Sequence, residues 1–442
     1  MGLRETVERA AELLGKKAIN DFEIFGISSD IIRAESKGQQ LESLTRSNES
    51  GISIRVLIEG AMGFSYGFEA NENLVDAAVT SARYQFKDNH NHFPEPRAAG
   101  YRNIEVFDPE VASMSPDDCV GRAVQLEKAA RESDQRVEKV RKASFSRSSS
   151  TVHIINSNGI QGFFSVTSVG TSLMVTVRQG AEVQSGHDFD FSHKLRGFDV
   201  DKVGRTAVAR AAALLGARQL KTAMIPVLFD PMTTAEMIEF ISDAFLGENV
   251  IKGKSYLRDK LGLNLFSDCI TLYDNPLDER ASDSCPFDGE GVTSQYSILV
   301  EQGTVKGFLY DSYWASVAGK DSTGNSVRSG YRSWPSLNIR HMCLDPSGEP
   351  MSQVLSNLPQ VLKVTDIMGM HTANPITGEL SVGITGILLE HGSPAYPVRE
   401  AALSGNIYDM FSRVICVGDD VRKFGQVLCG SLLVDAVDIS SQ

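Results

Sequence analysis

Strand-like patterns dominate two long stretches of this 442-residue chain and leave room for few helices. Short runs rich in β-branched and aromatic residues fill 137–195, and strands dominate again from residue 268 to the end. Helical patterns of apolar residues occur before and between these stretches, at 3–16, 74–84, 115–133, 199–217 and 233–247. The chain is therefore predicted to adopt an α+β fold, with a mixed α/β domain at 1–220 and a strand-rich domain at 221–442.

The strands predicted for the first half are short. We expect them at 23–27, 31–36, 41–45, 51–58, 61–68, 138–146, 152–156, 163–170 and 172–179. Residues 63–67 also match the G-x-S-x-G pattern of a nucleophile elbow. An elbow requires its serine at a sharp turn from a strand into a helix, whereas Ser65 falls within the second arm of a predicted hairpin. We interpret this segment as a strand whose glycines permit close packing.

The net charge and the spacing of the cysteines argue against several classes of function. A net charge of −13 argues against nucleic acid as a main ligand, because phosphate binding requires a basic surface. No apolar run approaches the about 18 residues that cross a membrane. The six cysteines are scattered and include no Cys-x-x-Cys pair, which is typical of reduced thiols. We therefore expect a cytoplasmic protein that binds neither nucleic acid nor membranes.

The histidines in the first half do not form a recognisable metal motif. His187 and His193 share one face of a predicted strand but lie about 20 Å apart there, too far to bind one ion. His90 and His92 have no third ligand nearby, and zinc requires at least three. The chain also contains no His-Glu-x-x-His, no Walker A loop and no dinucleotide-binding glycine motif. These patterns give no support for nucleotide binding.

The helix predicted at 233–247 follows a buried strand predicted at 225–229. Thr233 and Glu236 form a capping-box pattern at its start. An apolar stripe faces the core and consists of Met237, Ile241, Ala244 and Phe245. We interpret Ile238 as one more core residue of this helix and Asp243 as a solvated charge.

Three polar, glycine-containing loops between predicted strands are candidates for binding. The first contains Asp288 and Glu290 among turn-forming glycines. The second contains Asn325, and the third contains His371 and Asn374. Binding groups tend to collect in such loops. An acidic turn is the simpler interpretation of the first loop taken alone.

Taken together, these loops resemble segments of the TldD/PmbA family of two-chain peptidases, which also carries the label modulator of DNA gyrase. Residues 285–293 resemble the family's PFDGEG stretch, 305–311 the strand after it, 322–325 its TGN loop, 369–375 its GMHGANP stretch and 428–433 its closing segment. The correspondence is densest from residue 225 to the end. It is weaker, but in the same order, through 41–66.

The resemblance also implies a zinc site whose histidines this chain lacks. TldD-type chains of the family carry His-Glu-x-x-x-His on the helix, and a cysteine near the C-terminus completes their metal site. Alignment through the Gly/Lys-rich segment after the helix puts Ile238 and Asp243 at the two histidine positions. Glu239 then takes the place of the general base, and Cys429 falls where the third ligand is expected. One thiol and one carboxylate make a poor zinc site, so we expect no metal cofactor in this chain.

We therefore interpret the chain as a PmbA-type, or TldE-type, subunit of a cytoplasmic heteromeric metallopeptidase. The resemblance implies a TldD-type partner that supplies the zinc and the general base, and substrates that are unfolded peptides. This chain would shape a closed chamber and hold the peptide by strand addition. The residues predicted to line that chamber are Asp288, Glu290, Asn325, His371 and Asn374.

Two alternatives remain open. The chain could be a homodimeric peptide-binding or scaffold protein without a peptidase partner, since a chain that pairs with a similar fold has a surface suited to self-pairing. It could instead be a cysteine-dependent hydrolase with Cys429 as nucleophile and His371 as base. A buried structural thiol is the simpler interpretation of Cys429.

Overall fold

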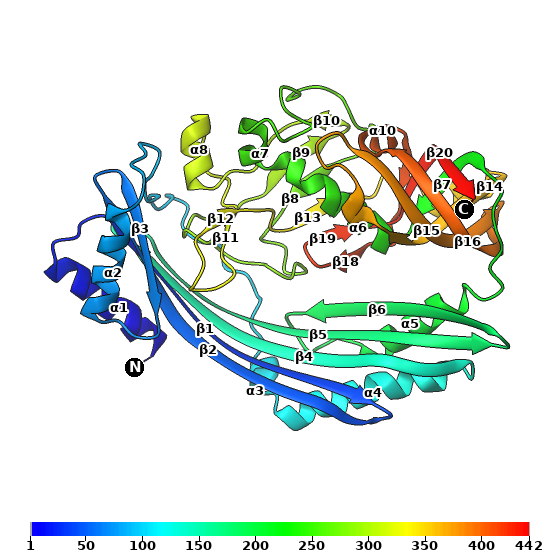
Figure 1. Ribbon diagram of the computed structural model, residues 1–442, viewed down its shortest axis with the longest axis horizontal. Coiled ribbons are helices and arrows are strands. Elements are labelled where there is room, and N and C mark those ends of the chain that lie inside the picture. Colours follow the sequence, from blue (N-terminus) through cyan, green and yellow to red (C-terminus); the bar gives the residue numbers. More distant parts are fainter. Residues whose placement is uncertain (1, 442) are drawn as a thin grey trace.

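The computed structural model describes residues 2–441. The chain forms one long antiparallel sheet and a second, more irregular body that lies against it (Figure 1). All strands of the long sheet come from residues 22–192, and the remaining strands come from residues 223–441. Helices and sheets both contribute to each half of the chain, so the predicted α+β class is confirmed.

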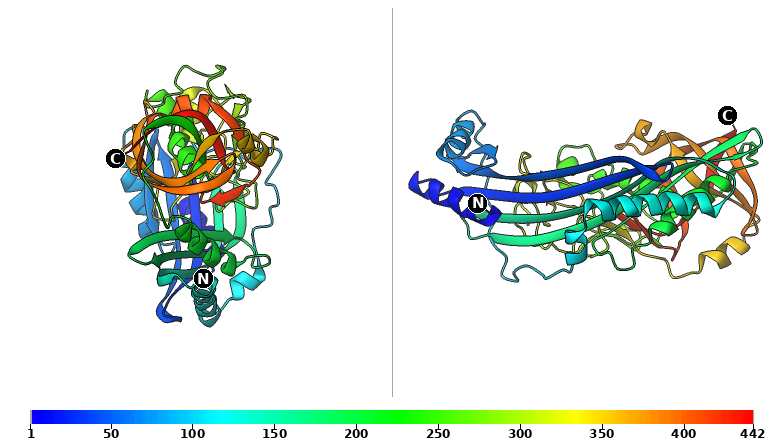
Figure 2. Two further views of the ribbon diagram at one scale, coloured as in Figure 1. Left: turned by 90° about the vertical axis from the view of Figure 1, so that its right-hand side faces the viewer. Right: turned by 90° about the horizontal axis from the view of Figure 1, so that it is seen from below.

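The long sheet has six antiparallel strands in the order β3-β2-β1-β4-β5-β6. They are β1 (Phe22–Lys37), β2 (Gln40–Ile58), β3 (Ala61–Gly67), β4 (Val137–Asn156), β5 (Gln161–Gln179) and β6 (Glu182–Ser192). At about 3.3 Å per residue, a strand as long as β4 spans about 65 Å. Figure 2 shows these strands running along most of the length of the molecule.

The strands predicted for the first half were too short. The predicted runs 23–27 and 31–36 are one strand, β1, and β4 and β5 each join two predicted runs in the same way. The residues between the predicted runs are mostly serine and threonine, and on the sheet they continue the alternation of faces. They bond across the strands, as in Ser29–Ser150 at 2.8 Å and Thr151–Ser165 at 3.0 Å between hydroxyl oxygens.

Helices cover one face of the long sheet. Ile24 and Ile32 of β1 both point toward this face, where α1 and α2 pack at one end and α4 and α5 at the other. The helices of this half are α1 (Leu3–Lys16), α2 (Glu72–Arg83), α3 (Pro109–Ser113), α4 (Pro116–Ser133) and α5 (Val200–Ala212). A Cβ on Gly63 would lie 2.1 Å from a backbone oxygen of α2, so the interpretation of 63–67 as a closely packed strand is confirmed.

The second body contains a closed ring of five strands. Their order is β16-β15-β14-β7-β20, and a pairing of β16 with β20 closes the ring, which Figure 2 shows end-on. The strands are β7 (Ala223–Phe229), β14 (Gln360–Met368), β15 (Glu379–Glu390), β16 (Ser393–Asn406) and β20 (Leu432–Ser441), with β17 (Val414–Val417) on the outer edge of β20. Helix α6 (Pro231–Ser242) follows β7, and the largest apolar core of the chain surrounds it.

A second sheet of short strands lies beside the ring, in the order β10-β9-β8-β13-β19-β18. The strands are β8 (Leu272–Asp274), β9 (Ser297–Glu301), β10 (Thr304–Val305), β13 (Met342–Leu344), β18 (Arg422–Phe424) and β19 (Val427–Cys429). The remaining elements are the pair β11 (Ser326–Val327) and β12 (Ser336–Leu337), the 3-10 turns η1 (Asp243–Phe245) and η2 (Met370–Thr372), and the helices α7 (Gly247–Ile251), α8 (Ser312–Ala318), α9 (Met351–Ser356) and α10 (Ile407–Ser412). Within residues 2–441, no helix combines the length and the apolar character needed to cross a bilayer.

The face of the long sheet opposite its helices is turned toward the second body. Phe25 of β1 points to this side and packs in a cluster with Phe287 and Tyr331 of the second body. Further along, Arg422 of β18 bonds to Asp188 of β6 at 2.9 Å. The two halves of the chain are therefore joined by side-chain contacts at both ends of the sheet.

Candidate functional site

Helix α6 begins two residues before its predicted start. The Asp230 carboxylate caps it by accepting a hydrogen bond from the backbone N–H of Thr233 at 3.0 Å, and Pro231 occupies the first turn. Arg210 holds the other oxygen of Asp230 at 2.7 Å. The predicted capping box at Thr233 and Glu236 is therefore wrong. An aspartate followed by proline is a stronger start signal, and it leaves Thr233 buried inside the first turn.

The two positions that the family resemblance predicts as counterparts of zinc-binding histidines differ in their surroundings. Ile238 is fully buried in the core around α6 and offers no ligand atom. Asp243 lies in the 3-10 turn after the helix and is exposed, as is Glu239. Ile238 is thus a core residue and Asp243 a surface carboxylate, as the apolar pattern of this helix predicted.

Cys429 lies at the opposite end of α6 from Asp243. Its thiol is fully buried on β19 and donates to the carbonyl oxygen of Pro231 at 3.3 Å. With a rise of 1.5 Å per residue, Ile238 and Asp243 lie about 10 and about 18 Å further along the helix. The structure therefore does not bring Cys429 together with these two positions. Zinc does not fit this set of residues, which offers only two separated ligand atoms.

Cys429 also lacks the surroundings of a catalytic thiol. Burial raises its pKa well above the ordinary value, and the nearby carboxylates of Asp420 and Asp230 raise it further. His371 is exposed in the turn between β14 and β15. Within residues 2–441 no hydrogen bond joins Cys429 to an imidazole, so the arrangement of thiol and base needed for nucleophilic catalysis is not formed.

The solvent-facing side of α6 is acidic. Burial, together with the negative charges of Asp366, Asp230 and Glu239, raises the pKa of Glu236 to about 7. Asp366 also lines a pocket of about 300 Å³ between the long sheet and the strands β14 and β15. Its other polar walls include His187, Arg210, Thr365 and Thr385. An imidazole, a guanidinium and a carboxylate in one pocket suit a polar ligand such as a peptide group.

Replacing Glu236 with glutamine is expected to stabilise the protein by about 1–2 kcal/mol at pH 8 and by little at pH 5. The pKa of Glu236 is raised in the folded state, so the folded protein holds this proton more tightly than the unfolded chain does. The contribution of Glu236 to stability is therefore complete below pH 4.5 and is lost as the pH rises to about 7. The full shift corresponds to about 3 kcal/mol, and partial solvation reduces it. Urea unfolding at pH 5, 6, 7 and 8 measures this effect. Glu239→Gln, an exposed neighbour on the same helix, is the control, and parallel curves for wild type and Glu236→Gln would contradict the prediction.

Asp288 holds its own loop in shape. One carboxylate oxygen accepts hydrogen bonds from the backbone N–H groups of Glu290 and Val292, both at 2.9 Å. The other oxygen accepts from the backbone N–H of Ser326 at 3.0 Å. Burial and the charge of Glu290 raise the pKa of Asp288 to about 7. The side chain is 3% exposed, and its oxygens accept hydrogen bonds from the protein's own backbone.

Glu290 is part of a buried ion network that joins the two halves. Its carboxylate accepts hydrogen bonds from Arg55 of β2 at 3.0 Å and from the backbone N–H of Ser312 at 3.1 Å. Arg55 also binds Glu23 of β1 through two nitrogens, at 2.9 and 2.6 Å, and Arg328 contacts the same glutamate. Burial alone would raise the pKa of Glu290, but the charge of Arg55 and the hydrogen bonds outweigh it and lower the pKa.

A pocket of about 290 Å³ borders this network between β2, β3 and the second body. Its walls include the carboxylates of Glu248, Glu290 and Asp311 and the rings of Trp314 and Trp334. Burial and the charge of Glu290 raise the pKa of Asp311 to about 7. Carboxylates and aromatic faces in one small pocket suit a positively charged group of a ligand.

Asn325 adjoins the Asp288 loop and is also buried. Its side-chain amide donates to Asp274 at 2.8 Å, and its carbonyl oxygen accepts from the hydroxyl of Thr323 at 2.6 Å. The next residue, Ser326, supplies the N–H that binds Asp288. The structure therefore brings Asp288, Glu290 and Asn325 into one region.

His371 and Asn374 lie elsewhere. Both are exposed in the turn between β14 and β15, and the Asn374 side chain accepts a hydrogen bond from the backbone N–H of Ile376 at 2.9 Å. This is a local turn contact. The five residues predicted to line one chamber thus fall into a buried group of three and an exposed pair.

Comparison with known protein families covers most of the chain. Residues 222–441 match the PmbA/TldA metallopeptidase C-terminal domain, residues 109–215 the central domain and residues 22–82 domain 1. The chain belongs to the PmbA/TldD metallopeptidase family. The ring of strands, α6 and the Asp288 loop all fall within the C-terminal domain of the family.

Individual PmbA/TldD proteins match over nearly the whole chain. Metalloprotease PmbA of Escherichia coli O157:H7 is 26% identical over 448 residues, which cover 100% of this chain and 96% of that protein. TldE of Thermococcus kodakarensis has the same fold, with a TM-score of 0.89 at 24% identity over 98% of this chain and 100% of that one. A candidate modulator of a DNA gyrase from Thermotoga maritima superposes with a TM-score of 0.91 at 23% identity, over 99% and 100% of the two chains.

Sequence reasoning missed Arg55 and Arg328, the two cations of the buried network. Arg55 stands in the apolar run Ile-Ser-Ile-Arg-Val of β2, and a charge inside such a run signals a buried partner. Its partner Glu290 lies 235 residues further along the chain. In this PmbA/TldD chain the PFDGEG-like stretch therefore faces the N-terminal sheet, a contact that spacing in the sequence cannot reveal.

Proposed function

We propose that this chain is the non-catalytic, PmbA-type subunit of a heteromeric metallopeptidase that cleaves unfolded peptides. A TldD-type partner would supply the zinc and the general base. The observation that carries this proposal is α6, where Ile238 is buried and Asp243 is exposed at the two positions that the family resemblance aligns with zinc-binding histidines. No histidine lies between His193 and His341, so this stretch of the chain offers no other histidine to replace them.

The face of the long sheet that is turned toward the second body supports a role in holding peptides. Every second residue of β4 from 144 to 150 is a serine, and each is half-buried on this face. They pair with Ser172, Gly170, Ser168 and Val166 of β5. Such small, uncharged side chains impose little selection on a bound sequence. A surface of this kind suits unfolded peptides of varied sequence better than one defined substrate.

The far end of β1 and β2 supports association with a second chain. Leu41 and Leu44 are 49% and 42% exposed on β2, near its hairpin with β1. An apolar group at the end of a long sheet suits burial against another subunit. We assign this surface to the TldD-type partner, which is expected to have a similar shape.

The test compares this chain alone with the same chain co-purified with a TldD-type chain from the same organism. We expect cleavage of unfolded casein only by the co-purified complex. Replacing the first motif histidine of the partner is expected to abolish cleavage. Glu239→Ala in this chain is expected to change the rate by less than about twofold, because without a metal ligand beside it Glu239 cannot act as the base.

Two results would overturn the proposal. Cleavage by the lone chain that Glu239→Ala abolishes would make this chain the catalyst. A stable homodimer that binds casein and never associates with the TldD-type chain, as judged by light scattering after size-exclusion chromatography, would favour the scaffold alternative.

A further inference from the structure

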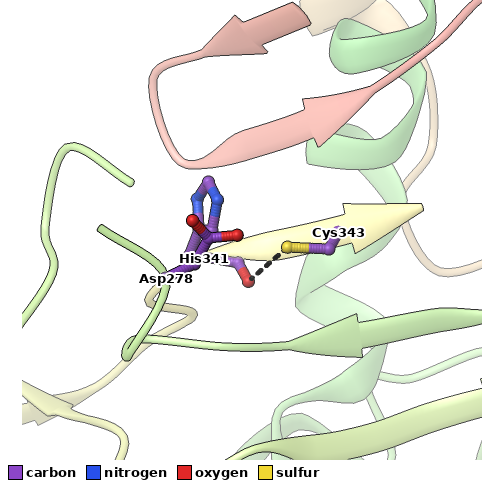
Figure 3. A group of neighbouring side chains, drawn as sticks. All are labelled: Asp278, His341 and Cys343. Carbon is purple, nitrogen blue, oxygen red and sulfur yellow. Dashed lines mark hydrogen bonds between the residues drawn. The ribbon is translucent and has the colours of Figure 1, made fainter. Parts of the chain in front are cut away.

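Three potential metal ligands meet beside the short strand β13, away from α6. His341 and Cys343 are two residues apart on extended chain, so their side chains share a face. Asp278 lies in the loop after β8, the strand that pairs with β13. Figure 3 shows the three side chains grouped around one point. Each residue offers one ligand atom, and these three atoms lie within 4.8 Å of one another. They are an imidazole nitrogen, a thiol sulfur and a carboxylate oxygen.

His341 is a buried polar residue whose ring nitrogens make no hydrogen bond to the rest of the described chain. It is completely buried. Burial lowers its pKa to about 4, against the opposing charges of Asp278 and Asp283 and a weaker effect of the Gln426 backbone, which lies outside hydrogen-bond geometry. The ring is therefore neutral at physiological pH, with a free lone pair. A buried polar group without a partner is costly, and a bound cation would remove that cost.

The other two side chains are also free to bind. Cys343 is 1% exposed, and its sulfur makes only a long contact, 3.8 Å, to the carbonyl oxygen of His341. Three N–H groups of Arg280 bind the Asp278 carboxylate, at 2.9, 2.9 and 2.6 Å. A fourth contact, from Nε of Arg280 to the other carboxylate oxygen, is the longest at 3.2 Å, and a metal ion at that position would take its place. Arg280 thereby fixes the orientation of Asp278, as outer groups commonly do around metal ligands.

We propose that Asp278, His341 and Cys343 bind one Zn²⁺ ion, with a water molecule as the fourth ligand. Nitrogen, sulfur and oxygen donors together match zinc. Tetrahedral zinc needs ligand atoms about 3.4–3.7 Å apart, so the partly exposed loop that carries Asp278 would close by about 1 Å. The ion would displace the thiol proton, and the resulting thiolate and the carboxylate balance its charge. Burial leaves no access for a peptide, so the ion would tie the loop after β8 to β13 and would not catalyse.

This site is separate from the α6 positions that correspond to the family's zinc motif, and the inference does not rest on the proposed peptidase role. The full-length chain, treated with chelator and dialysed, is titrated with Zn²⁺ and, in parallel, with Co²⁺. We expect one equivalent of either ion to bind, a sulfur-to-cobalt charge-transfer band in the near ultraviolet, and a higher melting temperature with Zn²⁺. Cys343→Ala is expected to abolish the band, and Asp278→Asn to weaken binding by at least about 100-fold.

The matched control is Cys429→Ala, which removes another buried thiol of the same half and is expected to keep the band and the stoichiometry. Circular dichroism confirms that each variant is folded, and His341→Gln provides a second ligand variant if Cys343→Ala does not fold. No band in wild type, or an equal band in Cys343→Ala, would overturn the proposal. A band lost in Cys429→Ala but kept in Cys343→Ala would also overturn it and would place the metal at α6.

Discussion

Replacing Arg55 with methionine is expected to lower the free energy of unfolding by about 3–5 kcal/mol, the range typical of breaking a buried ion pair. The side chains of Arg55, Glu23 and Glu290 are 6%, 1% and 5% exposed. Methionine fills much of the same volume but removes the guanidinium that bonds to Glu290, which keeps the N–H of Ser312 and the more distant charge of Arg328. Chemical or thermal unfolding monitored by circular dichroism measures the loss.

A control lies on the same strand. Arg46 of β2 binds Asp30 of β1 through two nitrogens, at 3.0 and 3.2 Å, but its side chain is 54% exposed. Arg46→Met is expected to cost about 1 kcal/mol or less, because water screens an exposed pair. Equal effects of the two substitutions would show that burial does not decide the strength of the Arg55 network.

A second substitution isolates the charge. Adding Glu290→Gln to Arg55→Met is expected to restore part of the lost stability, since the amide keeps the bond from Ser312 without an unpaired charge. The pH dependence follows from the lowered pKa of Glu290. The contribution of ionised Glu290 to stability is complete above pH 4.5 and is lost as the pH falls through the lower pKa of the folded state. Arg55→Met is expected to remove that part of the acid sensitivity.

Patterns within a single helix or hairpin were enough to predict some features of the fold. The apolar stripe of α6 correctly assigned Ile238 to the core, and the hairpin around Ser65 excluded a nucleophile elbow. The length of the strands was missed because serines in β4 resemble breaks when read alone. On the sheet these serines form one continuous polar face, and only the pairing with β5 reveals it.

Contacts between residues far apart in the sequence could not be predicted, and they determine the structure of the site. Glu290 lies in a loop of the second body and was predicted to line a chamber, whereas Arg55, the residue that fixes its role, lies in the long sheet of the other half. The same holds for the ligands beside β13. His341-x-Cys343 is a local signal, but Asp278 joins it only because β8 pairs with β13. Neither cluster has a spacing that a sequence motif could record.

Replacing Phe287 with alanine is expected to cost about 3–5 kcal/mol, as for other fully buried aromatic side chains. Phe287 precedes Asp288 in the PFDGEG-like stretch and is 2% exposed. Its ring lies 4.8 Å from the ring of Tyr101 and 5.1 Å from that of Phe164 on β5, between centroids. Phe163→Ala, the residue before Phe164 on β5 and 59% exposed, is expected to cost about 0.5 kcal/mol or less.

Gly162 tests whether the cost comes from the contact between the two halves. A Cβ on Gly162 would lie 2.7 Å from the tip of the Phe287 ring. Gly162→Ala is therefore expected to destabilise wild type by about 1–3 kcal/mol and to cost clearly less when Phe287 is alanine. If Phe287 instead served a bound peptide, Phe287→Ala would slow peptide cleavage by the complex without lowering stability. Coupling between the two substitutions would identify the PFDGEG-like stretch as the joint that holds the long sheet against the second body.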